Sequence, residues 1–339
     1  MGTHNIIEPA QLLQLQMNHV STIYETYHSL LQNHPKEKAN ELTKHYCMNY
    51  FPKTVDEQLA VLEFLYMNDH FKELKKILRS HDFLEEVTFL YKILLNRLEK
   101  HFSIKDILSI ESLEFKHPSL KCLHVYTIIY LYYDLKKYTG LDKFIDQCYL
   151  KLSDVREPLF HYYMKIRFNE LTFHHYWKTN SIILAKKYAY KVLNMSLSPR
   201  KLSAVHHNLA LCYVFEGFTP AFDNAQIALD IAKKHNFHSM ISSLEHHTIP
   251  FICAFHHQTN AISTPDPIET AHLAIANKQI NKAVEILSSL KTLTPFQECY
   301  LGVATENKKL LHQSERRFID EYGDHFFAML PKYYLERLK

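Results

Sequence analysis

Three polar residues, Asn169, Asn208 and Glu269, hold equivalent positions in three predicted helical hairpins. Each stands nine residues before a turn residue, and a second helix follows. In a stack of such hairpins the first helix of each pair lines one concave surface, so these side chains are predicted to face one groove. A carboxamide both donates and accepts hydrogen bonds, and can therefore hold the backbone of an extended peptide whatever its sequence. The alternative interpretation is that these residues cap turns or bind neighbouring helices.

A fourth polar residue, Arg200, follows Pro199 at the predicted start of a helix. Its guanidinium could hold the terminal carboxylate of a peptide through two parallel hydrogen bonds. The alternative is a solvated arginine at the surface of a helix start. Together with the three groove residues, Arg200 makes peptide binding the chemistry that the sequence favours.

The 24 histidines include four adjacent pairs, such as His174-His175. Adjacent residues on a helix point about 100° apart and do not chelate one ion together, and no HExxH motif or cysteine spacing supports a metal site. Arg167 and His174 have the R-x6-H spacing that some helical ribonucleases use. A nuclease is therefore one function to weigh against peptide binding. The chain contains no GxSxG, P-loop or GxGxxG motif. We therefore predict a protein that is not an enzyme and has no cofactor or metal.

The element that positions these residues is a predicted hairpin over residues 203–236. It has a turn at Glu216-Gly217, and small residues stand seven positions apart at Ala221 and Ala228. This pattern is typical of tetratricopeptide-type repeats, in which a hairpin buries its apolar face by stacking on neighbours. Only 5 of 339 residues are glycine, which argues against strand-rich folds. The fold class predicted is all-α, a right-handed superhelix of such hairpins.

Charge and cysteine content indicate the cellular compartment and the kinds of partner that the protein could bind. The formal net charge of +3 does not indicate nucleic-acid binding by the whole chain. A local basic group at Lys72, Lys75, Lys76 and Arg79 fits a solvated helix face. The six cysteines are dispersed within apolar windows, as expected for buried thiols in a reducing cytoplasm. No signal peptide or apolar run long enough to span a membrane is evident.

Taken in order, the chain reads as alternating helices and short links. We expect a tail over residues 1–19, a degenerate repeat array over 20–257, and C-terminal repeats over 258–339 that end in a capping or dimerisation helix, His325 to Leu338. Thr54 is expected to cap a helix, and a long helix from His117 is expected to stop at Gly140.

Four stretches resemble the arbitrium receptor family, AimR: ELTKHYCMNYFPKTVDEQLAVLEFLYMNDHFKELKKIL (41–78), PRKLSAVHHNLALCYVF (199–215), AIANKQINKAVEILSSL (274–290) and YGDHFFAMLPKYYLERLK (322–339). The resemblance runs in order over roughly residues 20 to 339, and the GD-x5-LP tail is its most specific part. It implies a helical-repeat receptor, encoded by a phage, that senses a short secreted peptide and governs the choice between lysis and lysogeny.

The resemblance also implies roles for individual residues. Arg200 matches an arginine that engages the peptide's C-terminal end, Glu269 lies at or beside an acidic peptide contact, and Asp324 matches an aspartate that pairs with the peptide's arginine. Phe326 and Phe327 would form an apolar wall. Leu211 stands where the family has a peptide-binding asparagine, with Asn208 one turn earlier.

Longer family members begin with a helix-turn-helix domain, for which we expect no room in the roughly 20 residues ahead of the first matching helix. We therefore predict a cytoplasmic receptor, in a bacterial host cell, for an arginine-containing peptide of about six residues. It would act through DNA or a protein partner and could dimerise through its C-terminal helix. The alternative function is a helical-repeat adaptor that sequesters a regulatory protein without any peptide.

Overall fold

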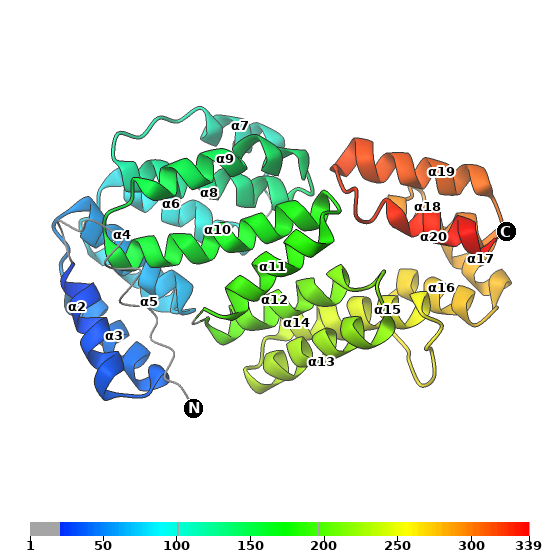
Figure 1. The fold of residues 1–339 in the computed structure, drawn as a ribbon, viewed down its shortest axis with the longest axis horizontal. Coiled ribbons are helices and arrows are strands. Elements are labelled where there is room, and N and C mark those ends of the chain that lie inside the picture. Colours follow the sequence, from blue (N-terminus) through cyan, green and yellow to red (C-terminus); the bar gives the residue numbers. More distant parts are fainter. Residues whose placement is uncertain (1–20, 100–101, 196, 339) are drawn as a thin grey trace. The chain divides into compact units, whose positions relative to one another are not determined.

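The computed structural model describes residues 21–99, 102–195 and 197–338, which form helices joined by short links and contain no strand (Figure 1). The predicted all-α class is confirmed. The helices group into two compact units. The first holds the chain up to Thr172 together with residues 194–198, and the second holds residues 173–193 and the chain from Pro199 onward. The division expected after residue 257 lies within the second unit.

The first unit is built from α2 to α9 and most of α10. Their bounds are α2 (Thr22–Asn33), α3 (Lys36–Asn49), α4 (Val55–Met67), α5 (Phe71–Ser80), α6 (Glu85–Asn96), α7 (Ile104–Glu111), α8 (Pro118–Asp134), α9 (Thr139–Ser153) and α10 (Pro158–Lys178). Two of these helices, α4 and α8, are buried on nearly every side. Such helices form the centre of a unit, and amphipathic ones such as α5 cover them. The expected tail over residues 1–19 lies outside the described residues.

The start of α4 follows directly from its sequence. The hydroxyl of Thr54 accepts a hydrogen bond from the backbone N–H of Glu57, and the Glu57 carboxylate accepts one from the backbone N–H of Thr54. This reciprocal pair satisfies two backbone donors that the first turn of a helix leaves unpaired. The predicted cap at Thr54 is confirmed.

The core of the first unit contains a buried ion pair. Arg167 on α10 donates to both carboxylate oxygens of Glu63 on α4, at 2.7 and 3.2 Å, and both side chains are at most 1% exposed. The hydroxyl of Tyr91 donates to the same carboxylate at 2.8 Å. The guanidinium also lies 4.7 Å from the ring centre of Tyr66. A buried pair needs such additional hydrogen bonds to offset the cost of removing two charges from water.

The second unit continues the helical hairpins. It holds the end of α10, followed by α11 (Ile182–Leu193), α12 (Pro199–Cys212), α13 (Phe218–Lys234), α14 (His238–Ser243), α15 (Ile249–Phe255), α16 (Pro267–Ala276), α17 (Ile280–Ser288), α18 (Pro295–Ala304), α19 (Lys308–Arg317) and α20 (Met329–Arg337). The predicted hairpin over 203–236 is present as α12 and α13. Ala221 and Ala228 on α13 are fully buried, as expected where two helices approach closely.

A wider helical turn over Leu244–Thr248 joins α14 to α15. Pro250 stands in the first turn of α15. Because proline has no backbone N–H, it cannot donate the hydrogen bond that would continue a regular helix from α14. The segment Leu244–Thr248 is a π-helical turn, in which each N–H bonds to the carbonyl five residues earlier. This turn lets the helical chain continue past the missing hydrogen bond.

Seven of the described helices end in the same way without glycine. At each end one residue has a positive φ between 51° and 65°, and the next residue's N–H bonds back five residues, for example from Gln279 to the carbonyl of Ala274 at 2.8 Å. This is the Schellman motif, whose left-handed position is usually glycine. Here the left-handed residues are Asp69, Lys136, Asn180, Asn236, His257, Lys278 and Glu306. The low glycine content is thus compatible with many tight turns.

Two expected helix boundaries were wrong. The long helix α8 ends at Asp134, because Lys136 takes the left-handed conformation. Gly140, the expected stop, instead lies in the first turn of α9. At the other end of the chain, α20 begins at Met329 rather than at His325, because Asp324 caps a separate turn and accepts from the N–H of Phe327.

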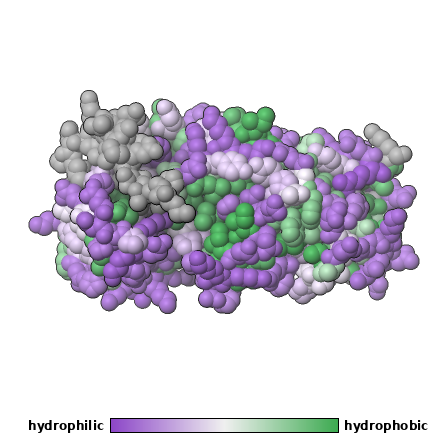
Figure 2. All heavy atoms as spheres, turned by 60° about the horizontal axis from the view of Figure 1, so that its bottom comes forward, coloured by the Kyte–Doolittle hydropathy of each residue, from purple (hydrophilic) through white to green (hydrophobic). Residues whose placement is uncertain are grey.

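All six cysteines are buried, and they lie on six different helices. No helix among the described residues is both long and apolar enough to cross a bilayer. Figure 2 shows hydrophilic residues over much of the visible surface, with apolar residues exposed between them. Single exposed apolar side chains such as Ile183, at 83% exposure, are normal for a protein surface.

Candidate functional site

The second unit contains two carboxyl groups of low exposure, each surrounded by polar and aromatic side chains. The first belongs to Asp324, which follows Gly323 in a left-handed turn at the end of the segment Phe318–Tyr322. Its Oδ2 lies 2.8 Å from Nζ of Lys178, and its Oδ1 accepts from the N–H of Phe327 at 3.0 Å. Because the backbone N–H of His325 also donates to the carbonyl of Lys178, this contact has both a side-chain and a backbone component.

An aromatic cluster surrounds this ion pair. The Nζ of Lys178 lies 4.0 Å from the ring centre of Trp177 and 4.9 Å from that of Phe327. Phe327 in turn packs on Phe296 at 5.0 Å and on Phe326 at the same separation. The apolar rings exclude water, which strengthens the attraction between the ammonium and the carboxylate. The expected apolar wall of Phe326 and Phe327 is a buried core element in this structure.

The second carboxyl group belongs to Glu269, in the first turn of α16 behind the N-cap residue Asp266. Only 13% of its side-chain surface is exposed. Its Oε2 lies 3.4 Å from Nδ1 of His272, and Nε2 of His272 lies 2.5 Å from the hydroxyl of Tyr334. The ring of Tyr300 stacks on His272 with the ring centres 4.1 Å apart. Its hydroxyl is buried and has no hydrogen-bond partner among the described residues.

Burial sets the charge state of this second cluster. Desolvation, reinforced by the nearby charge of Asp266, raises the pKa of Glu269 to about 8. Burial, with smaller contributions from His257 and Arg337, lowers the pKa of His272 to about 3. At pH 7 the carboxyl group is therefore mostly protonated and the imidazole is neutral. The 3.4 Å contact is consequently a neutral hydrogen bond and not an ion pair.

The other predicted groove residues lie on different elements. Asn208 on α12 is half-buried, and its amide nitrogen lies 3.1 Å from Nε2 of His174. Arg200, in the first turn of α12, is exposed. Asn169 belongs to the first unit, where it is buried with its amide nitrogen 3.7 Å from the sulfur of Met195. That Asn169 shares one groove with Asn208 and Glu269 stays a prediction.

The pair proposed for a nuclease has other functions in the structure. Arg167 is fully engaged by Glu63 in the core of the first unit, whereas His174 belongs to the second unit and contacts Asn208. A buried arginine that neutralises a buried glutamate has a structural role. Within the described residues, no group of three or more histidine, cysteine or acidic side chains could hold a metal ion. The adjacent histidines instead bond separately, as when His207 contacts the hydroxyl of Thr248 at 2.7 Å.

The sequence patterns do not predict the partners at the centre of these clusters. Lys178, nine positions after Asn169, pairs with Asp324, which is 146 positions away. His272 stands three positions after Glu269, on the same helix face, so that spacing was an available signal. The contact of His272 with Tyr334 was not, because 62 residues separate the two.

The fold and these residues can now be compared with known proteins. The sequence profile of the AimR transcriptional regulator-like family matches residues 39–337. The chain belongs to this family. The AimR match spans nearly all of both units described above, including α12, α16 and the segment that carries Asp324. The family resemblance read from the four quoted stretches is therefore confirmed.

Similar proteins also cover most of this chain. An uncharacterized protein of Bacillus anthracis, pXO2-35, is 25% identical over 260 residues, which cover 73% of this chain and 92% of the relative. The solved structure of phAimR with a ligand superposes with a TM-score of 0.77 at 17% identity, over 96% of this chain and 99% of that chain. A second phAimR structure, of the selenomethionine protein, gives 0.66 at 16% identity, over 97% and 92%. At these identities the two structures support the shared fold.

Proposed function

We propose that this AimR-family protein is an intracellular receptor for a short secreted signalling peptide that contains arginine. Peptide binding would change the conformation of the helical repeats and thereby the association of the protein with DNA or a protein partner. If a phage encodes the protein, this response to the peptide would regulate the choice between lysis and lysogeny. The peptide would contact Asn208, Arg200, Glu269 and Asp324, which all belong to the second unit.

The observation that carries the proposal is the state of Glu269. It is a largely buried carboxyl group whose neighbour His272 is neutral, and no lysine or arginine among the described residues pairs with it. Burying a carboxyl group without a cation is costly, and the cost appears as the raised pKa. A ligand guanidinium would remove that cost by pairing with the ionised form. Such a charge-assisted contact contributes on the order of 1.5 to 3 kcal/mol.

Asp324 supports the same chemistry in a different way. Its carboxylate already holds a cation, the ammonium of Lys178, inside the aromatic cluster. A guanidinium from a peptide would have to displace that ammonium, so binding at Asp324 would be an exchange of one cation for another. Glu269 has no cation to displace, so pairing there costs less free energy. We therefore assign the peptide's arginine first to Glu269. The solved phAimR structure that contains a ligand is consistent with a ligand site in this fold.

Calorimetric titration with a panel of hexapeptides ending in Arg-Gly-Ala tests the proposal. We expect micromolar or tighter binding for one peptide, weakened at least tenfold by Glu269→Gln, equivalent to about 1.4 kcal/mol. Glu285→Gln on α17 is the matched control, because Glu285 is an exposed glutamate in the same unit. No binding to any peptide by folded protein would contradict the proposal and favour the peptide-independent adaptor.

Proton release provides a second readout. At pH 7 a carboxyl group with a pKa of about 8 is about nine-tenths protonated. Pairing with a guanidinium would ionise it, so about one proton should leave per peptide bound. Titrations in two buffers of different ionisation enthalpy measure that number. The release should vanish in Glu269→Gln, whereas release that is unchanged would place the arginine elsewhere.

A further inference from the structure

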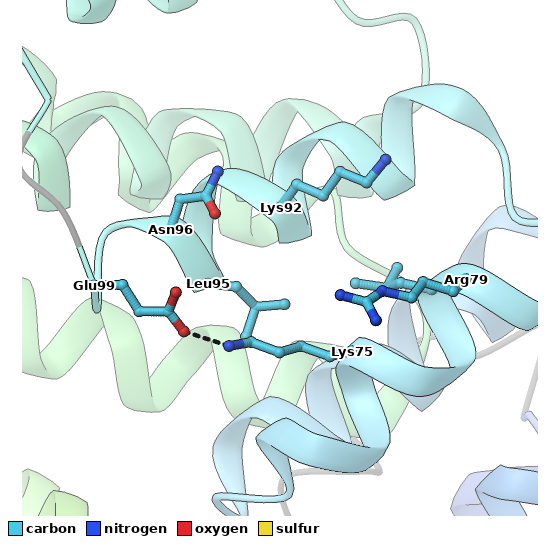
Figure 3. A pocket seen from close by; sticks show the side chains of 7 residues that line it. Lys75, Arg79, Lys92, Leu95, Asn96 and Glu99 are labelled. Atoms are coloured by element: carbon cyan, nitrogen blue, oxygen red, sulfur yellow. Dashed lines mark hydrogen bonds and ion pairs between the residues drawn. The ribbon is translucent and has the colours of Figure 1, made fainter.

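The first unit contains a basic pocket that none of the proposed peptide contacts lines. It has a volume of about 220 Å³ and lies between α5 and α6. Figure 3 shows Lys75 and Arg79 extending from α5 and Lys92 lying opposite on α6. Leu78 and Leu95 supply its apolar lining. Three cations from two helices therefore line one hollow.

The charges of this pocket are not balanced by the chain. Lys75 forms an ion pair with Glu99, the one acidic residue of the lining. Neither Arg79 nor Lys92 makes a hydrogen bond or ion pair with any described residue. The pocket thus keeps two positive charges in excess. Both side chains are exposed, so an anion in solution can reach them directly, and its attraction to them weakens as salt is added.

The local sequence of α5 adds to this imbalance. Lys75 and Arg79 are four residues apart on one face, and so are the exposed Lys72 and Lys76. Like charges at this spacing destabilise a helix by about 0.2 to 0.5 kcal/mol per pair. Glu73 is the only acidic residue on the helix. A bound anion would compensate for this repulsion.

We infer that the α5–α6 pocket binds a phosphate group. The planar guanidinium of Arg79 can hold two phosphate oxygens at once, and Lys92 and Lys75 add point charges. The exposed Lys72 and Lys76 continue the positive surface beyond the pocket, so it exceeds what one free phosphate needs. This extent favours the sugar-phosphate backbone of duplex DNA as the source of the phosphate. The inference does not depend on peptide binding.

The test uses the full chain and a fluorescein-labelled 20-base-pair duplex of mixed sequence, followed by anisotropy between 50 and 200 mM KCl. Arg79→Gln/Lys92→Gln should weaken binding at least tenfold at 50 mM and lower the salt slope by about 2, since two phosphate contacts are lost. Arg79→Lys, which keeps the charge but loses the planar fork, should weaken binding less. The matched control is Lys278→Gln/Lys282→Gln, which removes the same charge from two exposed lysines of the second unit, one in the turn before α17 and one in its first turn.

Inorganic phosphate forms the second arm, followed by the ³¹P linewidth. Broadening that the Arg79→Gln/Lys92→Gln variant abolishes, without any binding to the duplex, would support the pocket and identify a small phosphate compound as its ligand. Equal loss of duplex binding in the test and control variants would overturn the inference, because net charge alone would then explain binding. Failure of the folded wild-type protein to bind either probe would also overturn it.

Discussion

The ammonium of Lys178 lies 2.8 Å from the carboxylate of Asp324, although 146 residues separate them in the sequence. Each side chain is only 5% exposed. The pair connects the last residue of α10 to the turn that precedes α20. A buried pair of this kind is most sensitive to the removal of one partner, because the remaining charge is then left without compensation.

We therefore predict that Lys178→Met lowers the free energy of unfolding by about 3 to 5 kcal/mol, since it leaves the Asp324 carboxylate unpaired. Urea unfolding at pH 7 measures the change. The double variant Lys178→Met/Asp324→Asn should recover part of the loss, because the asparagine oxygen can still accept from the N–H of Phe327. Lys75→Met breaks the exposed pair with Glu99 and should cost less than about 1 kcal/mol. Equal losses in the buried and exposed pairs would contradict the prediction.

A second prediction concerns pH. The pKa of Glu269 is about 8 in the folded protein and about 4.3 in an unfolded chain. Between these values the folded state holds a proton that the unfolded state has lost, so stability falls as pH rises through this window. The slope is at most about 1.4 kcal/mol per pH unit. Glu269→Gln removes this contribution.

Urea unfolding at pH 5.5 and pH 8 provides the measurement. We expect wild-type stability to fall more than that of Glu269→Gln by at least about 1 kcal/mol. Glu157 in the first unit acts in the same direction, because burial raises its pKa to about 7. The comparison of variant with wild type cancels that contribution. Identical pH profiles for the two proteins would show that Glu269 ionises normally.

The sequence predicted local features better than long-range ones. The Thr54 cap and the hairpin over 203–236 depend on residues a few positions apart, and both are confirmed. The partner of Lys178 and the contact between His272 and Tyr334 depend on packing across many helices. The end of α8 was misplaced at Gly140 because glycine is the usual left-handed residue, whereas here Lys136 adopts that conformation.

Gly140 has a different role, which leads to a third prediction. A β-carbon at this position would lie 2.5 Å from Cγ of Tyr132, so the glycine permits close packing of α9 on α8. Gly140→Ala should destabilise the protein by about 1 to 3 kcal/mol through overpacking. At Gly217 the nearest atom would be 3.7 Å away, on Pro220, and Gly217→Ala should change stability by less than about 0.5 kcal/mol. Thermal unfolding of the two variants distinguishes them, and a reversed order would refute the packing argument.

The fourth prediction concerns the left-handed turns. Lys278 has a φ of 61°, a conformation that costs a residue with a β-carbon about 1 kcal/mol. Lys278→Gly should therefore raise the free energy of unfolding by about 0.5 to 1 kcal/mol. In contrast, Lys282→Gly places glycine inside α17 and should lower it by about 1 kcal/mol. Chemical denaturation would contradict the argument if both substitutions destabilised the protein.

The six buried cysteines have a practical consequence. Burial raises the pKa of every one of these thiols, and thiolate is the reactive form. A thiol reagent can therefore modify a cysteine only after the helix around it has opened. Cys47, Cys122 and Cys148 lie in the first unit and Cys212, Cys253 and Cys299 in the second. The alkylation rate of each cysteine, measured by mass spectrometry, therefore reports how often the helix around it opens. The wild-type chain allows this measurement at six positions without any introduced cysteine.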